Sequence, residues 1–228
     1  MPTIATPPRW LRPFAAAALA ACVLAGQAGA MEFSRQVPAD GCAACGWILA
    51  EGEIDEQTPG GFEDFLAREP DAPRLVRFHS TGGRIPFAMR LGQMIREGGF
   101  DTVVGRAMVR GRNGRPVRQR SDCYSACTVA FLGGNRRSVD QGRFGIHRPR
   151  VEPFGTEDRP YTPDQIKVGL RSARTFLSIF TLQMGVDAEF VDQTFADPAI
   201  RMLDRATLAR LRIITGGLTK PSGMKPRS

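Results

Sequence analysis

A serine and a histidine, the pair that cooperates in nucleophilic acyl transfer, stand at suggestive places in this sequence. The chain has only two histidines, His79 and His147, so a histidine-dependent reaction has to use one of them. Ser125 lies in SDCYSACTVAFLGG (121–134), where the apolar run predicts a short helix that begins beside the serine. The free N–H groups and the dipole of a helix N-terminus stabilise negative charge and so favour a nucleophile there. His147, in the sequence GIHRP, is then the predicted base for the serine proton.

A glycine pair supplies another part of such a site. Gly82 and Gly83 form a sharp turn directly after the β-rich run PRLVRFHS (73–80). A turn of this kind can present a backbone N–H group to the oxyanion that forms during acyl transfer. The sequence contains no metal-binding or nucleotide-binding motif, so no cofactor is expected.

The elements that must position these residues alternate between strand and helix. Hydrophobic periodicity predicts the following strands and helices: strands at 46–54, 73–80, 100–109 and 142–149, and helices at 58–69, 84–99, 164–184, 187–196 and 204–212. This alternation predicts an α/β fold with a largely parallel sheet, whose working groups gather at the carboxyl ends of the strands.

The longest predicted helix, 164–184, has one continuous apolar face. Its members recur at helical spacing: Ile166, Leu170, Ala173, Leu177, Phe180 and Met184. Such a face has to be buried, either against the body of the protein or against another subunit.

The first 30 residues resemble a secretory signal peptide. Arg9 and Arg12 precede a short apolar run, and the segment ends in Ala-Gly-Ala at Ala30. The apolar run is too short to span a bilayer, which takes roughly 20 residues. We therefore expect cleavage after Ala30 and a periplasmic or secreted protein. The alternative is a lipoprotein, because Leu-Ala-Ala-Cys resembles a lipobox that would anchor the chain at Cys22.

Export favours disulfides among the four cysteines that remain after cleavage, which are Cys42, Cys45, Cys123 and Cys127. Three pairings are possible, and the sequence does not choose among them. Cys123 and Cys127 are one helical turn apart, which is within disulfide range. A zinc site of four thiolates is the competing interpretation. Any disulfide that includes Cys127 removes it as a nucleophile.

The rest of the chain divides simply. We expect an N-terminal arm at 31–45, one α/β domain at 46–217 and a disordered tail at 218–228. The net charge is +8, and every charged residue of the segment Arg106–Arg120 is an arginine. This segment is expected to be a solvated basic loop or hairpin, with contact to anionic lipid or an acidic partner as the alternative. Nucleic acid is not expected as a partner outside the cytoplasm.

Several segments together resemble the ClpP/crotonase superfamily. FHSTGG (78–83) and the helix after it resemble the NSPGG-plus-helix segment of ClpP-like proteases. Residues 125–149 are similar to the serine-bearing helix and following strand of ClpP, of signal peptide peptidase A and of NfeD-type peptidases. Helix 164–184 resembles the long handle helix of ClpP, and residues 191–214 resemble the closing segment of the family.

The resemblance implies roles for particular residues. Ser125 is the implied nucleophile, His147 the base and Asp192 the acid that orients it, with Asp197 as a weaker substitute. The N–H groups of the oxyanion hole would come from Gly82, Gly83 and Ala126. Lys167 is an alternative base, because the signal peptide peptidase and NfeD relatives use a lysine.

One departure from the family concerns the nucleophile. Cys123-Tyr124-Ser125 replaces the family's Gly-x-Ala-Ser, and alignment on Phe131-Leu132 puts Cys127 in the place of the serine. Alignment on Ser-Ala-Cys-Thr favours Ser125.

The resemblance implies an exported serine peptidase or related hydrolase that acts on peptide or protein substrates and forms a homo-oligomer. The alternative is a non-catalytic binding or scaffolding protein with the same fold.

Overall fold

A computed structural model describes residues 29–42, 45–151 and 161–216. The structure describes only the last two residues of the expected signal peptide, and the rest of it, including Cys22, lies outside these ranges. The expected tail also lies outside them. Within them the main sheet has the strand order β1-β2-β3-β4-β8. Its strands are β1 (Glu32–Gln36), β2 (Trp47–Glu51), β3 (Leu75–His79), β4 (Asp101–Gly105) and β8 (Arg137–Asp140). β2, β3, β4 and β8 run parallel and β1 pairs antiparallel with β2, which confirms the predicted α/β fold with a largely parallel sheet.

A second, smaller sheet continues from the carboxyl end of β3. It contains β7 (Cys123–Tyr124), β9 (Phe144–Ile146) and β10 (Arg201–Met202), in the order β10-β9-β7. Ser80, directly after β3, joins the two sheets, because its N–H donates to the Asp122 carbonyl and its own carbonyl accepts from Tyr124 N–H. The turn that follows β3 and the start of the serine segment are thereby held side by side.

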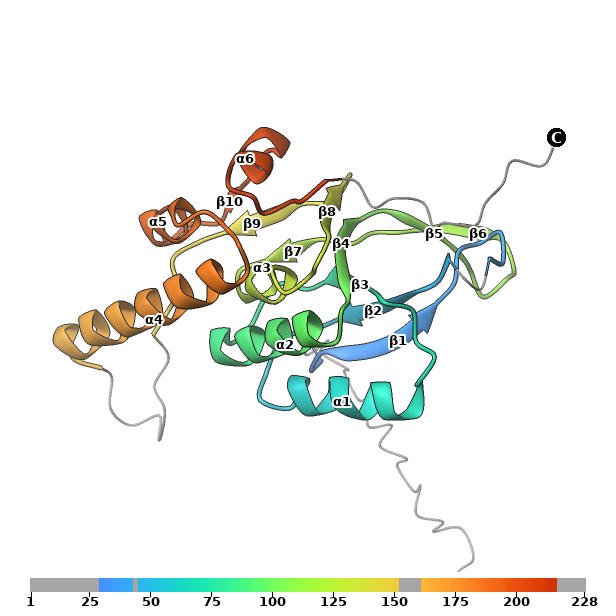
Figure 1. The fold of residues 1–228 in the computed structure, drawn as a ribbon, viewed down its shortest axis with the longest axis horizontal. Coiled ribbons are helices and arrows are strands. Elements are labelled where there is room, and N and C mark those ends of the chain that lie inside the picture. The colour runs from blue at the N-terminus through green and yellow to red at the C-terminus, as the bar shows by residue number, and fades with distance from the viewer. Residues whose placement is uncertain (1–28, 43–44, 152–160, 217–228) are drawn as a thin grey trace, which may run out of the picture.

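Helices cover the sheet and build the core. α1 (Thr58–Arg68) and α2 (Ile85–Glu97) lie together against one face of the main sheet (Figure 1). α3 (Ala126–Phe131) packs against α2 at Gly92, where a Cβ atom would come within 2.8 Å of the Phe180 ring. A group of fully buried phenylalanines fills the space between these layers: Phe62, Phe78, Phe100, Phe131, Phe144, Phe180 and Phe190.

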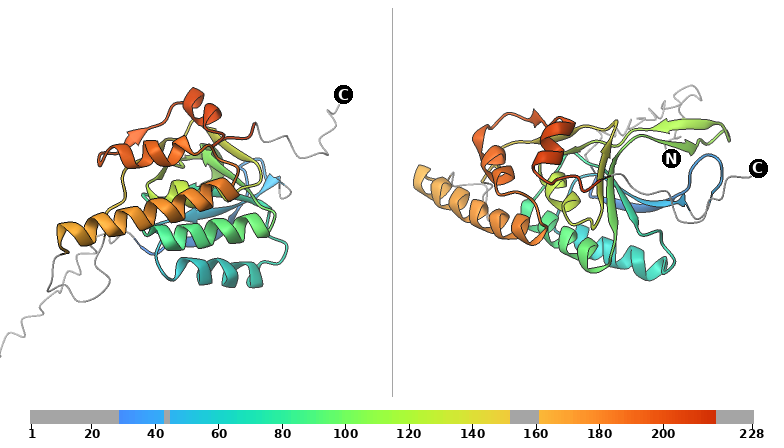
Figure 2. Two further views of the ribbon diagram at one scale, coloured as in Figure 1. Left: turned by 60° about the vertical axis from the view of Figure 1, so that its left-hand side comes forward. Right: turned by 45° about the horizontal axis from the view of Figure 1, so that its top comes forward.

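The C-terminal third adds three helices, α4 (Pro163–Gln183), α5 (Glu189–Ala196) and α6 (Arg205–Arg210). α4 begins at a capping box in which Thr162 and Gln165 bond each other's backbone N–H groups. It projects from the body at the opposite end of the molecule from the β5–β6 hairpin, β5 being Ala107–Arg110 and β6 Pro116–Gln119 (Figures 1 and 2). Among the described residues, no helix has both the length and the apolarity needed to cross a bilayer.

The predicted apolar face of α4 is buried only along its C-terminal half. Leu177, Phe180 and Met184 are buried in the core, whereas Ile166 is 39% exposed. A second apolar set on the same helix points outward, with large exposed fractions: Val168 (61%), Phe176 (61%), Ile179 (51%) and Leu182 (78%). α4 therefore uses one apolar face within the chain and leaves another uncovered.

Three sequence predictions differ from the structure in instructive ways. Residues 32–36, expected to lie in an arm, form the edge strand β1. The strand expected over 100–109 ends at Gly105, where the chain leaves the sheet and enters β5 of the arginine-rich hairpin. The strand β8 was not predicted, because its sequence Arg-Ser-Val-Asp is short and polar.

Candidate active site

The turn at Ser125 holds its side chain away from the helix that follows. Ser125 is the N-cap of α3, with φ 56° and ψ −128°. A residue with a side chain rarely adopts such angles, which cost on the order of 1–3 kcal/mol. The conformation is fixed from both sides, because Ser125 N–H donates to the Gly145 carbonyl and the Ser125 carbonyl accepts from Thr128 N–H and Oγ1. Strain of this kind is found where a nucleophile has to project from a sharp strand-to-helix turn.

We expect Ser125→Gly to be more stable than Ser125→Ala by about 1 kcal/mol, the net of relieved strain and the greater flexibility of the unfolded glycine variant. Both variants lack the hydroxyl group, so the comparison isolates the backbone. Urea denaturation of the two proteins gives the difference in the free energy of unfolding. Equal stability, or a more stable alanine variant, would show that the turn is not strained.

His147 contacts the serine hydroxyl through one ring nitrogen. Its Nε2 lies 2.7 Å from Ser125 Oγ, and its Nδ1 lies 2.9 Å from the backbone carbonyl of Arg148. A carbonyl oxygen only accepts hydrogen bonds, so Nδ1 carries the proton and Nε2 presents its lone pair to the hydroxyl group. This is the tautomer that a general base for Ser125 requires.

The N–H groups of Gly83, next to Gly82, and of Ala126, next to Ser125, are the remaining candidates for an oxyanion hole. Within the described residues neither group has a hydrogen-bond partner. Gly82 differs from the prediction, because its N–H donates to Ser80 Oγ at 3.1 Å. Its absent side chain matters instead, since a Cβ atom at Gly82 would come within 2.6 Å of Ser125 Cβ and 3.1 Å of Ala126 N. Gly82, at φ +116°, thus keeps open the space in front of Ser125 and the Ala126 N–H group.

The two predicted orienting acids and the alternative base do not bond to the pair. Asp192, on α5, forms an ion pair with Arg174 of α4. Asp197 accepts from Ala199 N–H through its side chain, while its carbonyl accepts from Arg148 N–H. Lys167 is paired with Asp164 on the first turns of α4. The Arg148 carbonyl takes the position at His147 Nδ1 that the sequence predicts for a carboxylate. A backbone acceptor cannot be predicted from residue types, because every residue has one.

The cysteines form two local disulfides, Cys42–Cys45 and Cys123–Cys127. Of the three possible pairings, this one leaves the N-terminal segment unlinked to the serine segment. Cys123 and Cys127 are both fully buried and enclose Ser125 within a five-residue covalent loop. Cys127 is therefore oxidised and cannot serve as the nucleophile.

An ion pair that residue types alone do not predict lies directly before this loop. Asp122 accepts three hydrogen bonds from Arg143, from its backbone N–H, Nε and Nη2, at 2.9–3.2 Å. Burial opposes ionisation of Asp122, but the hydrogen bonds and charge of Arg143 outweigh it and lower the pKa of the carboxyl group. The other histidine, His79, also contacts this segment, because its Nδ1 accepts a hydrogen bond from Asp122 N–H.

At acidic pH the free energy of unfolding should depend on the Asp122–Arg143 ion pair. The pKa of Asp122 is lower in the folded state than in the unfolded chain, so its contribution is present above about pH 4 and is lost as pH falls further. We expect acidification from pH 5 to pH 2.5 to cost the wild type about 1 kcal/mol more than Asp122→Asn. Denaturant titrations at the two pH values measure this difference. An identical loss in both proteins would contradict the assignment.

A pocket of about 430 Å³ adjoins the residues after His147. Its lining includes Arg148 and Arg150 together with Val151, Ile166 and Leu170. The pocket combines two arginine side chains with apolar ones. One of these arginines, Arg148, is also the residue whose backbone carbonyl accepts from His147 Nδ1.

Comparison with solved structures finds ClpP-like proteases. A mutant of the 1510-N membrane-bound stomatin-specific protease is 14% identical, with a TM-score of 0.49 over 71% of this chain and 73% of that chain. A ClpP1 mutant from Listeria monocytogenes is also 14% identical, with a TM-score of 0.49 over 71% of this chain and 84% of that chain. Another mutant of the stomatin-specific protease, in complex with a substrate peptide, is 14% identical and has a TM-score of 0.46 over 71% and 69%.

Comparisons with known protein families and with curated proteins give no match. At this identity and with TM-scores below 0.5, the likeness assigns no function to this chain.

Proposed function

We propose that this protein is a ClpP-like serine peptidase that acts by acyl transfer through Ser125, with His147 as the general base. The observation that supports this most directly is the 2.7 Å contact between Ser125 Oγ and an Nε2 atom in the accepting tautomer. It is a contact within hydrogen-bond reach, which a base needs in order to take the proton.

The proposed reaction has two steps. Ser125 Oγ attacks the carbonyl carbon of a peptide bond while its proton passes to His147 Nε2. The negative charge that develops on the carbonyl oxygen is stabilised by the N–H groups of Gly83 and Ala126. The imidazolium then donates its proton to the leaving amine, and water releases the acyl group by the same route in reverse. The Arg148 carbonyl accepts from Nδ1 throughout and holds the ring in place.

A fluorophosphonate probe tests the proposal, because it phosphonylates only a serine whose hydroxyl group is activated. The oxidised protein should be labelled at Ser125, with the adduct located by mass spectrometry, and heat-denatured protein should not. An unlabelled, folded protein with both disulfides intact would favour the alternative, a binding or scaffolding protein that retains the fold without the chemistry.

We also propose that the protein is exported and assembles into a homo-oligomer. Two disulfides are typical of proteins that mature in an oxidising compartment. The outward apolar set of α4 is a suitable subunit interface, because Phe176 and Leu182 would otherwise stay in water.

Oligomerisation can be tested at this face. We expect size-exclusion chromatography with light scattering to give a mass several times that of one chain. The double variant Phe176→Glu/Leu182→Glu should give the monomer mass, because two buried charges at an interface are costly. Lys167→Glu, a charge change on the same helix outside this apolar set, is the control and should keep the wild-type mass. A monomeric wild type, or an unchanged double variant, would exclude this interface.

A further inference from the structure

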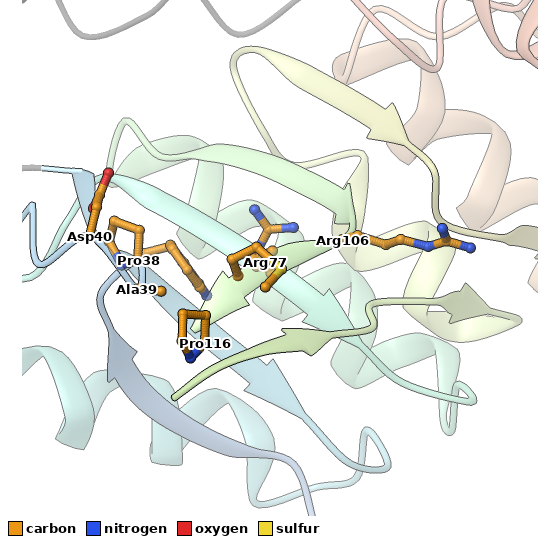
Figure 3. Close-up of a pocket in the computed structure, with 9 residues that line it drawn as sticks. Pro38, Ala39, Asp40, Arg77, Arg106 and Pro116 are labelled. Carbon is orange, nitrogen blue, oxygen red and sulfur yellow. The ribbon is translucent and has the colours of Figure 1, made fainter. Parts of the chain in front are cut away.

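A second pocket lies on the face of the main sheet opposite α1 and α2. The side chains of a strand alternate between faces, and Val76 and Phe78 of β3 face the helices in the core. Arg77 therefore faces the other way. Leu49 is the register partner of Arg77, which puts Trp47, two residues earlier on β2, on the same face. Arg77 and Trp47 line a pocket of about 460 Å³ that the N-terminal segment and the β5–β6 hairpin complete (Figure 3).

The guanidinium group of Arg77 is buried with one edge unpaired. Arg77 is 8% exposed, and its ring contact is Trp47, whose centroid lies 4.9 Å from Cζ. Nη1 donates to the Gly105 carbonyl at 3.1 Å. Nε is enclosed without a hydrogen-bond partner, and no described residue accepts from Nη2. Because Nε is enclosed, Nη2 is the nitrogen that can donate a charge-assisted hydrogen bond to a carboxylate in the pocket.

This buried cation also has no carboxylate within ion-pair distance in the described part of the chain. No described carboxylate forms an ion pair with Arg77. Burial lowers its pKa to about 10, and the charge of Asp140 offsets only part of that effect, so the group stays protonated at neutral pH. An unpaired buried charge is unfavourable, and an anionic ligand would relieve it.

We propose that this pocket binds a monocarboxylate with an apolar body, whose carboxylate accepts a hydrogen bond from Nη2 of Arg77. The lining suits such a body, because it includes the apolar side chains of Pro38, Trp47, Met108 and Pro116. The pocket volume is that of a small-molecule site. Asp40 also lines the pocket, and its negative charge disfavours a dianion such as phosphate. The proposal is independent of any chemistry at Ser125.

Trp47 makes binding measurable in the full-length protein. The chain has two tryptophans, Trp10 and Trp47, so Trp10→Phe leaves the indole in the pocket as the single tryptophan, which can be excited selectively. Titration of this protein with hexanoate should give a saturable change in emission, whereas hexanol should not. A capped apolar tripeptide, tested as the free acid and as the amide, distinguishes a peptide C-terminus from a free fatty acid as the source of the carboxylate.

Two arginine variants make the test specific. Arg77→Gln, in the Trp10→Phe background, should weaken hexanoate binding at least about tenfold. Arg106→Gln is the matched control, because Arg106 lines the same pocket but its side chain extends away from Arg77 (Figure 3), and it should bind within about threefold of the parent. If Arg77→Gln does not fold, the exposed rim variant Asp40→Asn should bind hexanoate about threefold more tightly.

The assignment would be overturned by any of three results. One is the absence of saturable binding by both hexanoate and the peptide acid. Another is equal binding by Arg77→Gln and Arg106→Gln, which would mean that the guanidinium only ties β3 to the end of β4 through the Gly105 carbonyl. The last is inorganic phosphate binding as tightly as hexanoate.

Discussion

Replacing His147 with glutamine is expected to slow the labelling of Ser125 by a fluorophosphonate about 10³-fold, while Asp192→Asn changes it less than about threefold. Glutamine can still donate a hydrogen bond to Ser125 Oγ, but it cannot take the proton. Asp192 is bound to Arg174, and the nitrogen that it would have to orient already donates to the Arg148 carbonyl. The rate constant for labelling, measured at several probe concentrations, separates the two variants.

The comparison decides between two architectures of the site. A large loss in Asp192→Asn with little loss in Asp192→Glu would mean that the helix α5 moves and that a carboxylate completes a triad during the reaction. Lys167→Met is the control for the alternative base, and it should label at the wild-type rate because Lys167 pairs with Asp164 on the exposed surface of α4. A large loss in Lys167→Met, with His147→Gln unaffected, would assign the base to the lysine.

The second large effect concerns the disulfide that encloses Ser125. We expect Cys123→Ala/Cys127→Ala to label about 10²-fold more slowly than the wild type, because a displacement of about 1 Å at a reacting atom can cost that much. Ser125 sits in an unfavourable backbone conformation, and the covalent loop from Cys123 to Cys127 is one of the constraints that keep it there. Without that constraint the turn can relax toward ordinary angles and carry Oγ away from His147.

The molecule contains its own control for this experiment. Cys42→Ala/Cys45→Ala removes a disulfide that lies away from the serine loop, and it should label at the wild-type rate. Circular dichroism and thermal unfolding show whether each variant is folded. Treatment of the wild type with dithiothreitol, followed by reoxidation, should lower and then restore labelling. Full labelling of folded Cys123→Ala/Cys127→Ala would mean that the hydrogen bonds of Ser125 with the Gly145 carbonyl and with Thr128 hold the serine without the disulfide.

The order of motifs along the chain predicts that Ser125 lies beside His147, and the 2.7 Å contact between them agrees with it, whereas the predicted place of Asp192 beside them does not. Ser125, His147 and the Gly82–Gly83 turn come from three distant segments, and parallel strands bring their carboxyl ends to one edge. The partner of His147 Nδ1 was not predictable, because it is a main-chain carbonyl. The position of Asp192 depends on how α4 and α5 pack, and the sequence pattern of each helix gives no information about that contact.

Strand β8 is a part of the fold that the sequence likewise does not predict. Arg137 begins this strand and is 2% exposed, which the rule that charged residues stay outside does not anticipate. Its guanidinium donates to the nearby carbonyls of Leu132 and Gly134 and to the distant carbonyls of Met184, Arg212 and Ile213. No local window of sequence contains the three distant acceptors.

This arrangement of Arg137 has a consequence for the order in which the chain becomes stable during synthesis. Ser125 and His147 have both left the ribosome well before Met184 and Ile213, which supply acceptors to Arg137. Until then the centre of the molecule holds a cation whose hydrogen bonds are mostly missing, so a nascent chain with the serine and histidine already made should remain loosely packed. Ribosome-bound chains that end at residue 160 should therefore be digested by protease, and chains that expose residue 216 should resist it.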